Sequence, residues 1–177
     1  MSLNLGLNLR PPARLGVLFA AATLLLDQAN KLWLMFVFDI EARQPVRLAP
    51  FFDVVFARNT GVSYSLFSGG GAGARVILLL VALAATAFLL ALLAHAKSRL
   101  VGAALGLIIG GALGNAVDRA AYGFVADFYF FHVGDFRWYV FNLADVAIVV
   151  GVALLLLDAL RGDRTEKTSR ERGAQAP

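Results

Sequence analysis

Long apolar stretches separated by short polar segments dominate the pattern of the chain. Residues 76–94 contain no charge, and residues 100–117 stay uncharged, with Asn115 near their end. A transmembrane helix needs roughly 20 predominantly apolar residues, so both stretches are long enough to cross a bilayer. The pattern predicts a membrane-spanning helix at each.

A third apolar block, at 15–26, reaches spanning length only if it continues through Phe38. That continuation places Asp27, Gln28 and Lys31 at membrane depth. A cleaved signal peptide is the alternative interpretation of this block, but no small-residue cleavage site follows it and the apolar pattern resumes.

The last apolar block, at 146–157, must extend back to about Tyr139 to span a bilayer. This extension places Asn142 and Asp145 inside the helix. We therefore predict an α-helical polytopic membrane protein with four transmembrane helices.

Two longer polar segments lie on one side of these helices, at 39–74 and 122–138. In the first, residues 51–57 and 61–67 have the composition of short strands and are separated by an Asn-Thr-Gly turn signal. We expect them to form a small β-hairpin on the membrane surface, joined to the next helix by a flexible glycine-rich segment at 68–73.

Composition agrees with this architecture and excludes several kinds of chemistry. Hydrophobic residues make up 59% of the chain and charged residues only 16%, with a mean hydropathy of +0.73. Soluble domains average roughly 25% charged residues. The chain contains no cysteine, which excludes disulfides, thiolate nucleophiles and Cys-ligated metal sites.

The basic residues predict the orientation of the chain. Nine lie on one side of the predicted helices, and five lie in the two loops on the other side. The nine are Arg10, Arg14, Lys97, Arg99, Arg161, Arg164, Lys167, Arg170 and Arg172. Because cytoplasmic segments are enriched in Lys and Arg, both termini should be cytoplasmic. Residues 1–160 then form a single membrane domain, and residues 161–177 form a polar cytoplasmic tail that we expect to be disordered.

Charged residues at membrane depth need a partner or a function, because each costs roughly 2.5–3.5 kcal/mol at the bilayer centre. Asp27 and Lys31 are one helical turn apart and can pair, and an ion pair that only helps the helix to pack is the alternative to a functional role. Asn115, Asp118 and Arg119 share one helical face. Asp118 and Arg119 could equally anchor the helix at the interface.

Two further carboxylates are harder to explain as structural. Asp145 shares a helical face with Asn142, and no cation is near it in sequence. Asp127 lies in the second outer loop between apolar neighbours. Because the third helix rises to the outer face and the fourth descends from it, the two carboxylates can approach each other at similar depth. Two close carboxylates share a proton, as in an aspartic protease, where one activates water and the other protonates the oxyanion. Two unrelated aspartates are the alternative.

A row of glycines at every fourth position marks one face of the third helix: Gly102, Gly106, Gly110 and Gly114. Such rows let helix backbones approach closely, so we interpret the row as a packing surface. It can serve contacts within one chain, which is compatible with a monomer.

Other hydrolytic and nucleotide-binding sites lack their signatures. No H-E-x-x-H pair is present, so a zinc metalloprotease is excluded. Residues 61–65 lack the last glycine of G-x-S-x-G, and the glycines at 68–73 are followed by no phosphate-binding lysine.

Five sequence blocks resemble, in order, the signature blocks of the bacterial type II signal peptidases, the lipoprotein signal peptidase family. They are DQANK at 27–31, NTGVSYSLF at 59–67, GGALGNAVDR at 110–119, VADF at 125–128 and FNLADVAI at 141–148. Together they extend from the first predicted helix to the fourth.

The resemblance implies an intramembrane aspartic endopeptidase of the bacterial inner membrane, with four transmembrane helices and a small extracytoplasmic β-sheet cradle. Its substrates would be diacylglyceryl-modified prolipoproteins, cut just before the lipidated cysteine, with Asp127 and Asp145 as the catalytic pair. It implies contact with membrane lipid, but no cofactor, metal or nucleic acid. Substrate-binding or dyad-supporting positions would be Asn59, Gly61, Asn115, Arg119 and Asn142, and structural polar positions would be Asp27, Lys31 and Asp118.

The chain departs from the family pattern at Ser63, Tyr64, Tyr139 and Val146. Because none of these is a catalytic position, the departures bear on substrate or inhibitor preference before activity. Two other classes compete with the peptidase: a small proton- or cation-coupled transporter, and a non-catalytic adaptor assembled through the glycine row. The transporter would place its carboxylates nearer the bilayer centre, and the adaptor would leave the acids unexplained.

Overall fold

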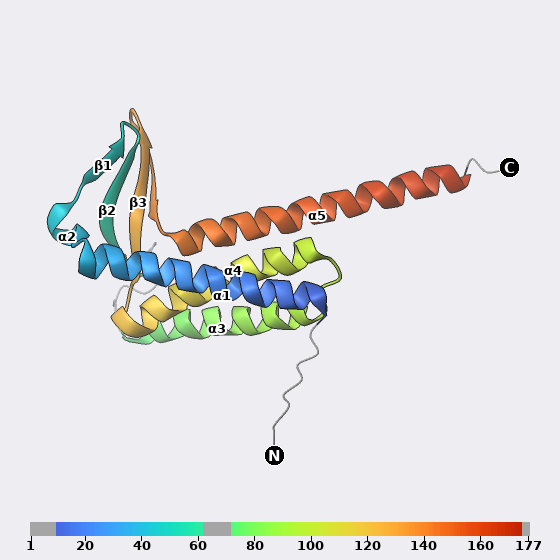
Figure 1. Cartoon of the computed structure of the whole chain (residues 1–177), viewed down its shortest axis with the longest axis horizontal. Helices are drawn as coiled ribbons and strands as arrows, with labels where there is room; N and C mark the ends of the chain where they lie inside the picture. Colours follow the sequence, from blue (N-terminus) through green and yellow to red (C-terminus); the bar gives the residue numbers. More distant parts are fainter. Residues whose placement is uncertain (1–9, 62–71, 175–177) are drawn as a thin grey trace, which may run out of the picture.

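A computed structural model of the chain describes residues 10–61 and 72–174. The elements follow in the order α1 (Pro11–Leu32), a π-helical turn η1 (Trp33–Val37), α2 (Ile40–Arg43), β1 (Val46–Ala49), β2 (Phe52–Asn59), α3 (Ala72–Ala94), α4 (Arg99–Tyr122), β3 (Val125–Val133), β4 (Phe136–Phe141) and α5 (Leu143–Ala174). Figure 1 shows a bundle of long helices with a small sheet at one end.

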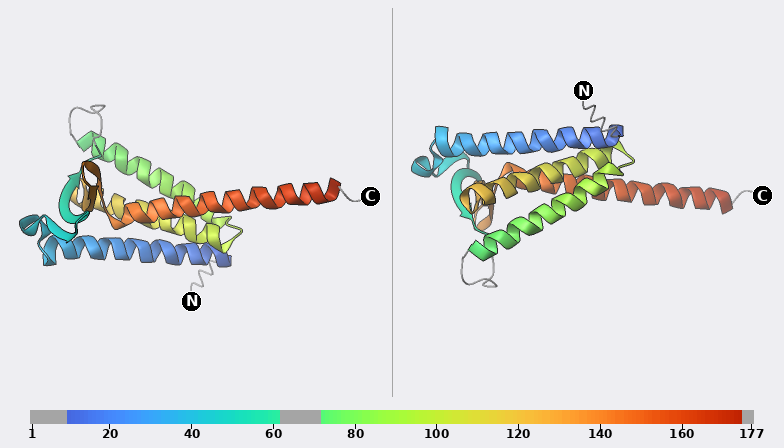
Figure 2. Two further views of the ribbon diagram at one scale, coloured as in Figure 1. Left: turned by 90° about the horizontal axis from the view of Figure 1, so that it is seen from above. Right: turned by 90° about the horizontal axis from the view of Figure 1, so that it is seen from below.

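Among the residues that the structure describes, three helical segments are long and apolar enough to cross a membrane: Val76–Ala94, Arg99–Tyr122 and Leu143–Arg161. Half of the α4 segment is buried inside the protein, whereas only 11% of the other two segments is buried. α4 is therefore the central helix, and Figure 2 shows it between α1 and α3, with α5 beside it.

The glycine row of α4 is a packing surface, as the sequence predicted, and it packs directly against α1. A Cβ atom on Gly102, Gly106 or Gly110 would collide with backbone carbonyls of α1. On another side of α4, a Cβ on Gly111 would lie 2.5 Å from the carbonyl oxygen of Ala144 in α5. Glycines of α4 thus allow the backbones of α1 and α5 to contact the backbone of α4 directly.

The sheet is antiparallel, with the strand order β1-β2-β3-β4. β2 confirms the strand expected at 51–57, and β1 is a second short strand within the loop at 39–74. The expected hairpin partner at 61–67 and the joint at 68–73 lie largely outside the described residues. The loop at 122–138 proves to contain β3 and part of β4, which the sequence analysis had not predicted.

A small apolar cluster fixes the sheet to the end of α1. Leu34 of η1 and Ile40 of α2 pack with Val54 of β2 and with Ala126 and Phe128 of β3, and all five are buried. The sheet is therefore part of the same body as the helices at this end, which gives residues on β2 and β3 fixed positions relative to α4 and α5.

The last helix begins later than predicted. β4 pairs with β3 as far as Phe141, and α5 begins at Leu143, so the predicted helical start at Tyr139 is wrong. Residues there are held extended by pairing with β3, and Asn142 stands just before the helix. At its other end the α5 helix continues to Ala174 and extends beyond the bundle in Figure 1. The tail boundary at residue 161 stays a prediction.

Candidate active site

Asp127 lies on β3, with its side chain buried at 2% exposure. Asn59 at the end of β2 donates from Nδ2 to Asp127 Oδ2 at 3.0 Å, and Asn142 donates from Nδ2 to Oδ1 at 2.7 Å. The β2–β3 register brings Asn59 to this position, because Ala57 is the cross-strand partner of Asp127. Side chains two residues apart on a strand share a face. Both carboxylate oxygens of Asp127 therefore accept a hydrogen bond.

Asp145 occupies the first turn of α5 and is fixed by a reciprocal cap. The backbone N–H of Asp145 donates to Asn142 Oδ1 at 3.0 Å, and the backbone N–H of Asn142 donates to Asp145 Oδ2 at 3.1 Å. This is the hydrogen-bond pattern of a capping box, in which the first and fourth residues satisfy each other's N–H groups. Asn115 of α4 donates from Nδ2 to the other oxygen of Asp145, at 2.9 Å.

Asn142 joins the two carboxylates. Its amide nitrogen donates to Asp127, its amide oxygen caps the helix turn that carries Asp145, and it is fully buried. The same nitrogen lies 3.1 Å from Asn115 Oδ1. The structure thus brings Asp127, Asp145, Asn115 and Asn142 into one hydrogen-bonded cluster, formed by β3, α4 and the start of α5.

The environment of Asp127 favours its protonated form. Burial raises the pKa of Asp127 to about 6, from an ordinary value of 3.8. The nearby charge of Asp145 also raises this pKa, whereas the donors Asn59 and Asn142 lower it.

Arg119 lies one helical turn beyond Asn115, on the same face of α4. Its Nη1 donates to the Asn115 carbonyl at 3.3 Å, and its positive charge acts on both Asp127 and Asp145. Its Nε is buried and has no hydrogen-bond partner among the described residues. Arg119 therefore retains a donor close to the carboxylate cluster.

The turn after β2 brings Gly61 next to Asn59. The Gly61 N–H donates to Asn59 Oδ1 at 2.9 Å, and Gly61 has a positive φ of 74°. This left-handed conformation favours glycine. A Cβ here would also lie 2.7 Å from a Leu78 methyl group of α3. The turn therefore holds the Asn59 amide in the orientation that directs its Nδ2 at Asp127.

The three predicted structural residues form a separate buried cluster between α1 and α4. Lys31 Nζ lies 2.9 Å from Asp27 Oδ2, 2.7 Å from Asp118 Oδ2 and 3.2 Å from Asn115 Oδ1. The side chains of all three are at most 1% exposed. The predicted pairing of Asp27 with Lys31 is therefore present, and Asp118 joins it instead of anchoring α4 at an interface. Asn115 links this ionic cluster to the carboxylate site.

The ionic cluster also holds the backbone beside each candidate catalytic residue. Asp118 Oδ2 accepts from the N–H of Ala126 at 3.1 Å, and Asp27 Oδ1 accepts from the N–H of Ala144 at 3.0 Å. Ala126 and Ala144 immediately precede Asp127 and Asp145. Asp27 and Asp118 thus hold the backbone one residue before each candidate catalytic aspartate.

Gln28 and Asn30 make contacts that the sequence did not predict. Gln28 lies with its amide nitrogen 3.0 Å from Asp118 Oδ1 and 3.1 Å from Asp27 Oδ2, and Asn30 accepts a hydrogen bond from the Tyr129 hydroxyl at 3.0 Å. Gln28 lies inside the DQANK block, so its polarity at membrane depth was a usable signal. Nothing in the sequence indicated the pairing of Asn30 with Tyr129.

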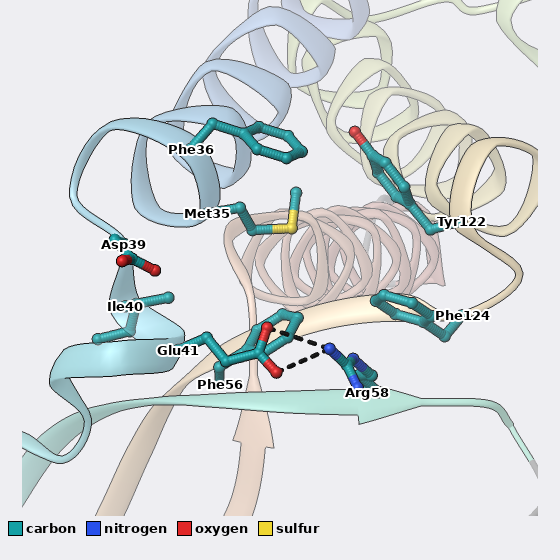
Figure 3. Close-up of a pocket in the computed structure, with 9 residues that line it drawn as sticks. All are labelled: Met35, Phe36, Asp39, Ile40, Glu41, Phe56, Arg58, Tyr122 and Phe124. Carbon is teal, nitrogen blue, oxygen red and sulfur yellow. Dashed lines mark hydrogen bonds and ion pairs between the residues drawn. The ribbon is translucent and has the colours of Figure 1, made fainter.

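A pocket of about 200 Å³ lies on the other face of the sheet from Asp127. Figure 3 shows it between η1 and α2, β2 and the end of α4, with Arg58 paired to Glu41 at 2.8 Å. Arg58 alternates along β2 with Ala57 and Asn59, so its side chain points to the opposite face. The pocket contains neither candidate catalytic carboxylate and is distinct from the site.

Two of the four departures from the family pattern, Tyr139 and Val146, have side chains outside the hydrogen-bonded cluster. Tyr139 is 78% exposed on β4, and Val146 is 42% exposed on α5. Ser63 and Tyr64 lie outside the described residues.

Comparisons with a family model and with known proteins all point to one family. A model of the family "Signal peptidase (SPase) II" matches residues 19–161. The lipoprotein signal peptidase of Methylocella silvestris is 63% identical over 168 residues, which cover 93% of this chain and 98% of that protein. The lipoprotein signal peptidase of Beijerinckia indica is 61% identical over 166 residues, which cover 94% of this chain and 95% of that protein.

The fold is also shared with solved structures of a bacterial membrane enzyme. One matches with a TM-score of 0.71 at 24% sequence identity, covering 82% of this chain and 92% of that chain. Another matches with a TM-score of 0.69 at 23% identity, covering 82% and 87% of the two chains.

Proposed function

The chain belongs to the signal peptidase II family of lipoprotein-processing proteases, and we propose that Asp127 and Asp145 are the aspartic dyad with which it cleaves prolipoproteins. The observation that carries the proposal is the double role of Asn142, whose amide binds Asp127 and caps the turn that holds Asp145. The transporter alternative is not supported, because the curated relatives are peptidases over nearly the whole chain.

Each carboxylate accepts two hydrogen bonds, and the raised pKa of Asp127 favours different roles for the two. Asp145 accepts from Asn115 and from the backbone of Asn142, which stabilises an ionised base. Asp127 carries the proton, in line with its raised pKa. Asp145 takes a proton from water as the water oxygen attacks the scissile carbonyl carbon, and Asp127 gives its proton to the carbonyl oxygen. In the second step Asp145 protonates the leaving nitrogen and the C–N bond breaks. Asp127 takes back a proton from a hydroxyl group of the tetrahedral intermediate, which becomes the carboxylic acid of the product.

Arg119, Asn59 and Gly61 complete the site. We assign Arg119 the role of donor to a backbone carbonyl of the substrate, because its buried Nε has no hydrogen-bond partner among the described residues. A substrate strand beside the dyad would place such a carbonyl within reach of the guanidinium. Asn59 stays with Asp127 and orients it, held in turn by the Gly61 N–H.

We infer that α1 is a fourth transmembrane helix. Its 22 residues extend about 33 Å, enough for the hydrocarbon core of a bilayer. Its two charges at membrane depth, Asp27 and Lys31, are buried against α4 and neutralise each other, so they are not exposed to lipid. With both termini cytoplasmic, the sheet and the dyad lie at the outer face of the bacterial inner membrane, where the lipid-modified substrate arrives.

Cleavage of a purified prolipoprotein tests the dyad. We expect Asp127→Asn and Asp145→Asn each to abolish cleavage of the lipidated substrate, because each removes one member of the acid–base pair while preserving shape. The two proteins should unfold at temperatures close to the wild type. Asp135→Asn, in the exposed turn between β3 and β4, is the matched control and should retain full activity.

Retained cleavage in either dyad variant would contradict the assignment. Unlipidated substrate run in parallel tests the substrate class, and we expect it to be cleaved poorly. Proton-coupled flux in liposomes, without peptide cleavage, would instead favour a transport function.

A further inference from the structure

A hollow of about 410 Å³ lies at the end of the helices remote from the sheet. Its apolar wall is formed by Leu92 of α3, by Val101 and Leu105 of α4, and by Leu155 of α5. Its volume falls within the roughly 300–1,000 Å³ typical of ligand pockets. Because α3 and α5 are both apolar enough to span a membrane, the groove between them opens toward the hydrocarbon of the bilayer.

The mouth of this groove is polar. His95, Lys97, Ser98 and Asp158 line it, and Ser98 Oγ lies 3.4 Å from Asp158 Oδ1. Lys97 is exposed and forms no ion pair with any side chain that the structure describes. An ammonium group thus stands where the apolar groove meets the membrane surface.

The lining contains one cation, Lys97, and one anion, Asp158, but the described charges at this end of the bundle are predominantly positive. Five basic residues gather at this end of the bundle, and Asp158 is the one acidic residue there whose side chain is described. The five are Arg10, Arg14, Lys97, Arg99 and Arg161. The resulting positive potential favours a negatively charged ligand.

We propose that this groove binds an anionic phospholipid, with one acyl chain against the leucines and the phosphate against Lys97. Basic pockets between transmembrane helices bind anionic head groups, and an apolar groove beneath the charge selects a lipid over a free phosphate. A zwitterionic lipid has the same chains but no net charge, so it lacks the electrostatic attraction. The inference rests on the membrane insertion proposed above, but not on the dyad, which lies at the opposite end of α4.

Lipid titration of the purified full chain tests the proposal. Phosphatidylglycerol and phosphatidylcholine with identical acyl chains are added to the protein in detergent, and bound lipid is counted by native mass spectrometry. We expect phosphatidylglycerol to bind about fivefold more tightly, as one basic contact near the membrane surface provides. Equal affinity for the two lipids would overturn the proposal.

Paired variants locate the site. Leu155→Trp fills the groove, whereas Leu156→Trp places the same side chain on a position that is 61% exposed. Lys97→Gln removes the charge at the mouth, whereas Arg137→Gln removes one from the exposed β4. We expect Leu155→Trp and Lys97→Gln each to weaken phosphatidylglycerol binding about fivefold and the two controls to leave it unchanged.

Wild-type binding by Leu155→Trp would overturn the groove as the site, and wild-type binding by Lys97→Gln would overturn the head-group contact. If Leu155→Trp fails to fold, Lys97→Gln decides the question, because an exposed lysine can be replaced without disturbing the core. Asp127→Asn should bind phosphatidylglycerol like the wild type. The lipid-binding proposal can therefore fail or succeed independently of the assignment of the aspartic dyad.

Discussion

Asn59 donates to one oxygen of Asp127, and its distance of 3.0 Å makes it a direct influence on how readily that carboxyl loses its proton. A donor to the ionised form lowers a pKa. Asn142, on the other oxygen, has the same effect but also caps α5. A substitution there would therefore change both the pKa of Asp127 and the start of the helix that carries Asp145. Asn59 therefore offers the cleaner probe of the electrostatics.

We expect kcat/KM to fall as the pH rises above about 6, because Asp127 must be protonated to act as the acid and its pKa is about 6. Asn59→Ala removes a donor that stabilises the ionised form, so the pKa of Asp127 rises and the descending limb moves to higher pH. The measurement is the pH profile of kcat/KM for cleavage of a lipidated peptide. Thr60→Ala, at the neighbouring exposed position, is the control. A descending limb that stays in place, or moves to lower pH, would argue against Asp127 as the acid.

At the scale of the element, the contact of α1 with α4 depends on the absence of side chains and on one buried ionic cluster. The glycine row brings the two helix backbones together, and this close approach places Asp27 and Lys31 against Asp118. Asp27 and Asp118 then hold the N–H groups of Ala144 and Ala126. The packing of α1 against α4 therefore helps to determine where Asp127 and Asp145 lie.

Gly106→Ala should destabilise the protein by about 1–3 kcal/mol, because the new methyl group would overlap the carbonyl of Gly16 in α1. Gly73→Ala is the matched control, since nothing lies within 4 Å of a Cβ at that exposed position in α3. Because alanine favours a helix over glycine, Gly73→Ala should be neutral or stabilising by up to about 1 kcal/mol. Equilibrium unfolding in mixed micelles measures both. Equal stability of the two variants would show that the glycine row is not a packing contact.

Lys31→Met should cost about 3–5 kcal/mol, because it leaves the buried carboxylates Asp27 and Asp118 without their cation. Lys97→Met, at an exposed lysine, should change the free energy of unfolding by less than about 0.5 kcal/mol in detergent free of anionic lipid. The same unfolding assay compares them. A loss of activity without a loss of stability in Lys31→Met would assign the lysine to the chemistry instead of the fold.

At the scale of the whole molecule, the sheet and the connection between α3 and α4 lie at opposite ends of the bundle (Figure 1). The candidate dyad lies at the end with the sheet, and the excess of basic residues lies at the other end. An orientation with that second end in the cytoplasm directs the dyad toward the outer surface.

The chain contains no cysteine, so single introduced cysteines report topology without background. We expect Asp135→Cys, between β3 and β4, to react with a membrane-impermeant maleimide in intact spheroplasts. Lys97→Cys, between α3 and α4, should react only after the membrane is opened. The reverse labelling pattern would refute the proposed orientation, and labelling of both sites in intact spheroplasts would show that the cells had leaked.

The sequence by itself determined the helical elements, because spanning a bilayer demands long uninterrupted apolar runs that are visible without any tertiary information. It also drew attention to the acids at membrane depth, since a charge is conspicuous in an apolar segment, and five sequence blocks in the right order indicated the family. The strand at 51–57 was also predictable from local sequence, because it is a short run of β-branched and aromatic residues that ends at a turn signal.

Only the tertiary structure decided which of these residues meet. The pairing of β3 with β2 joins segments distant in sequence, whereas β3 and β4 form a local hairpin whose turn, Gly134-Asp135, is a signal present in the sequence. Because β4 pairs with β3 as far as Phe141, the last helix begins only at Leu143. The hydrogen bonds that the N–H groups of Ala126 and Ala144 donate to Asp118 and Asp27 depend on directions in space that no spacing specifies. Periodicity along the chain reports which face of an element is apolar, whereas a site formed from four elements exists only once those faces have packed together.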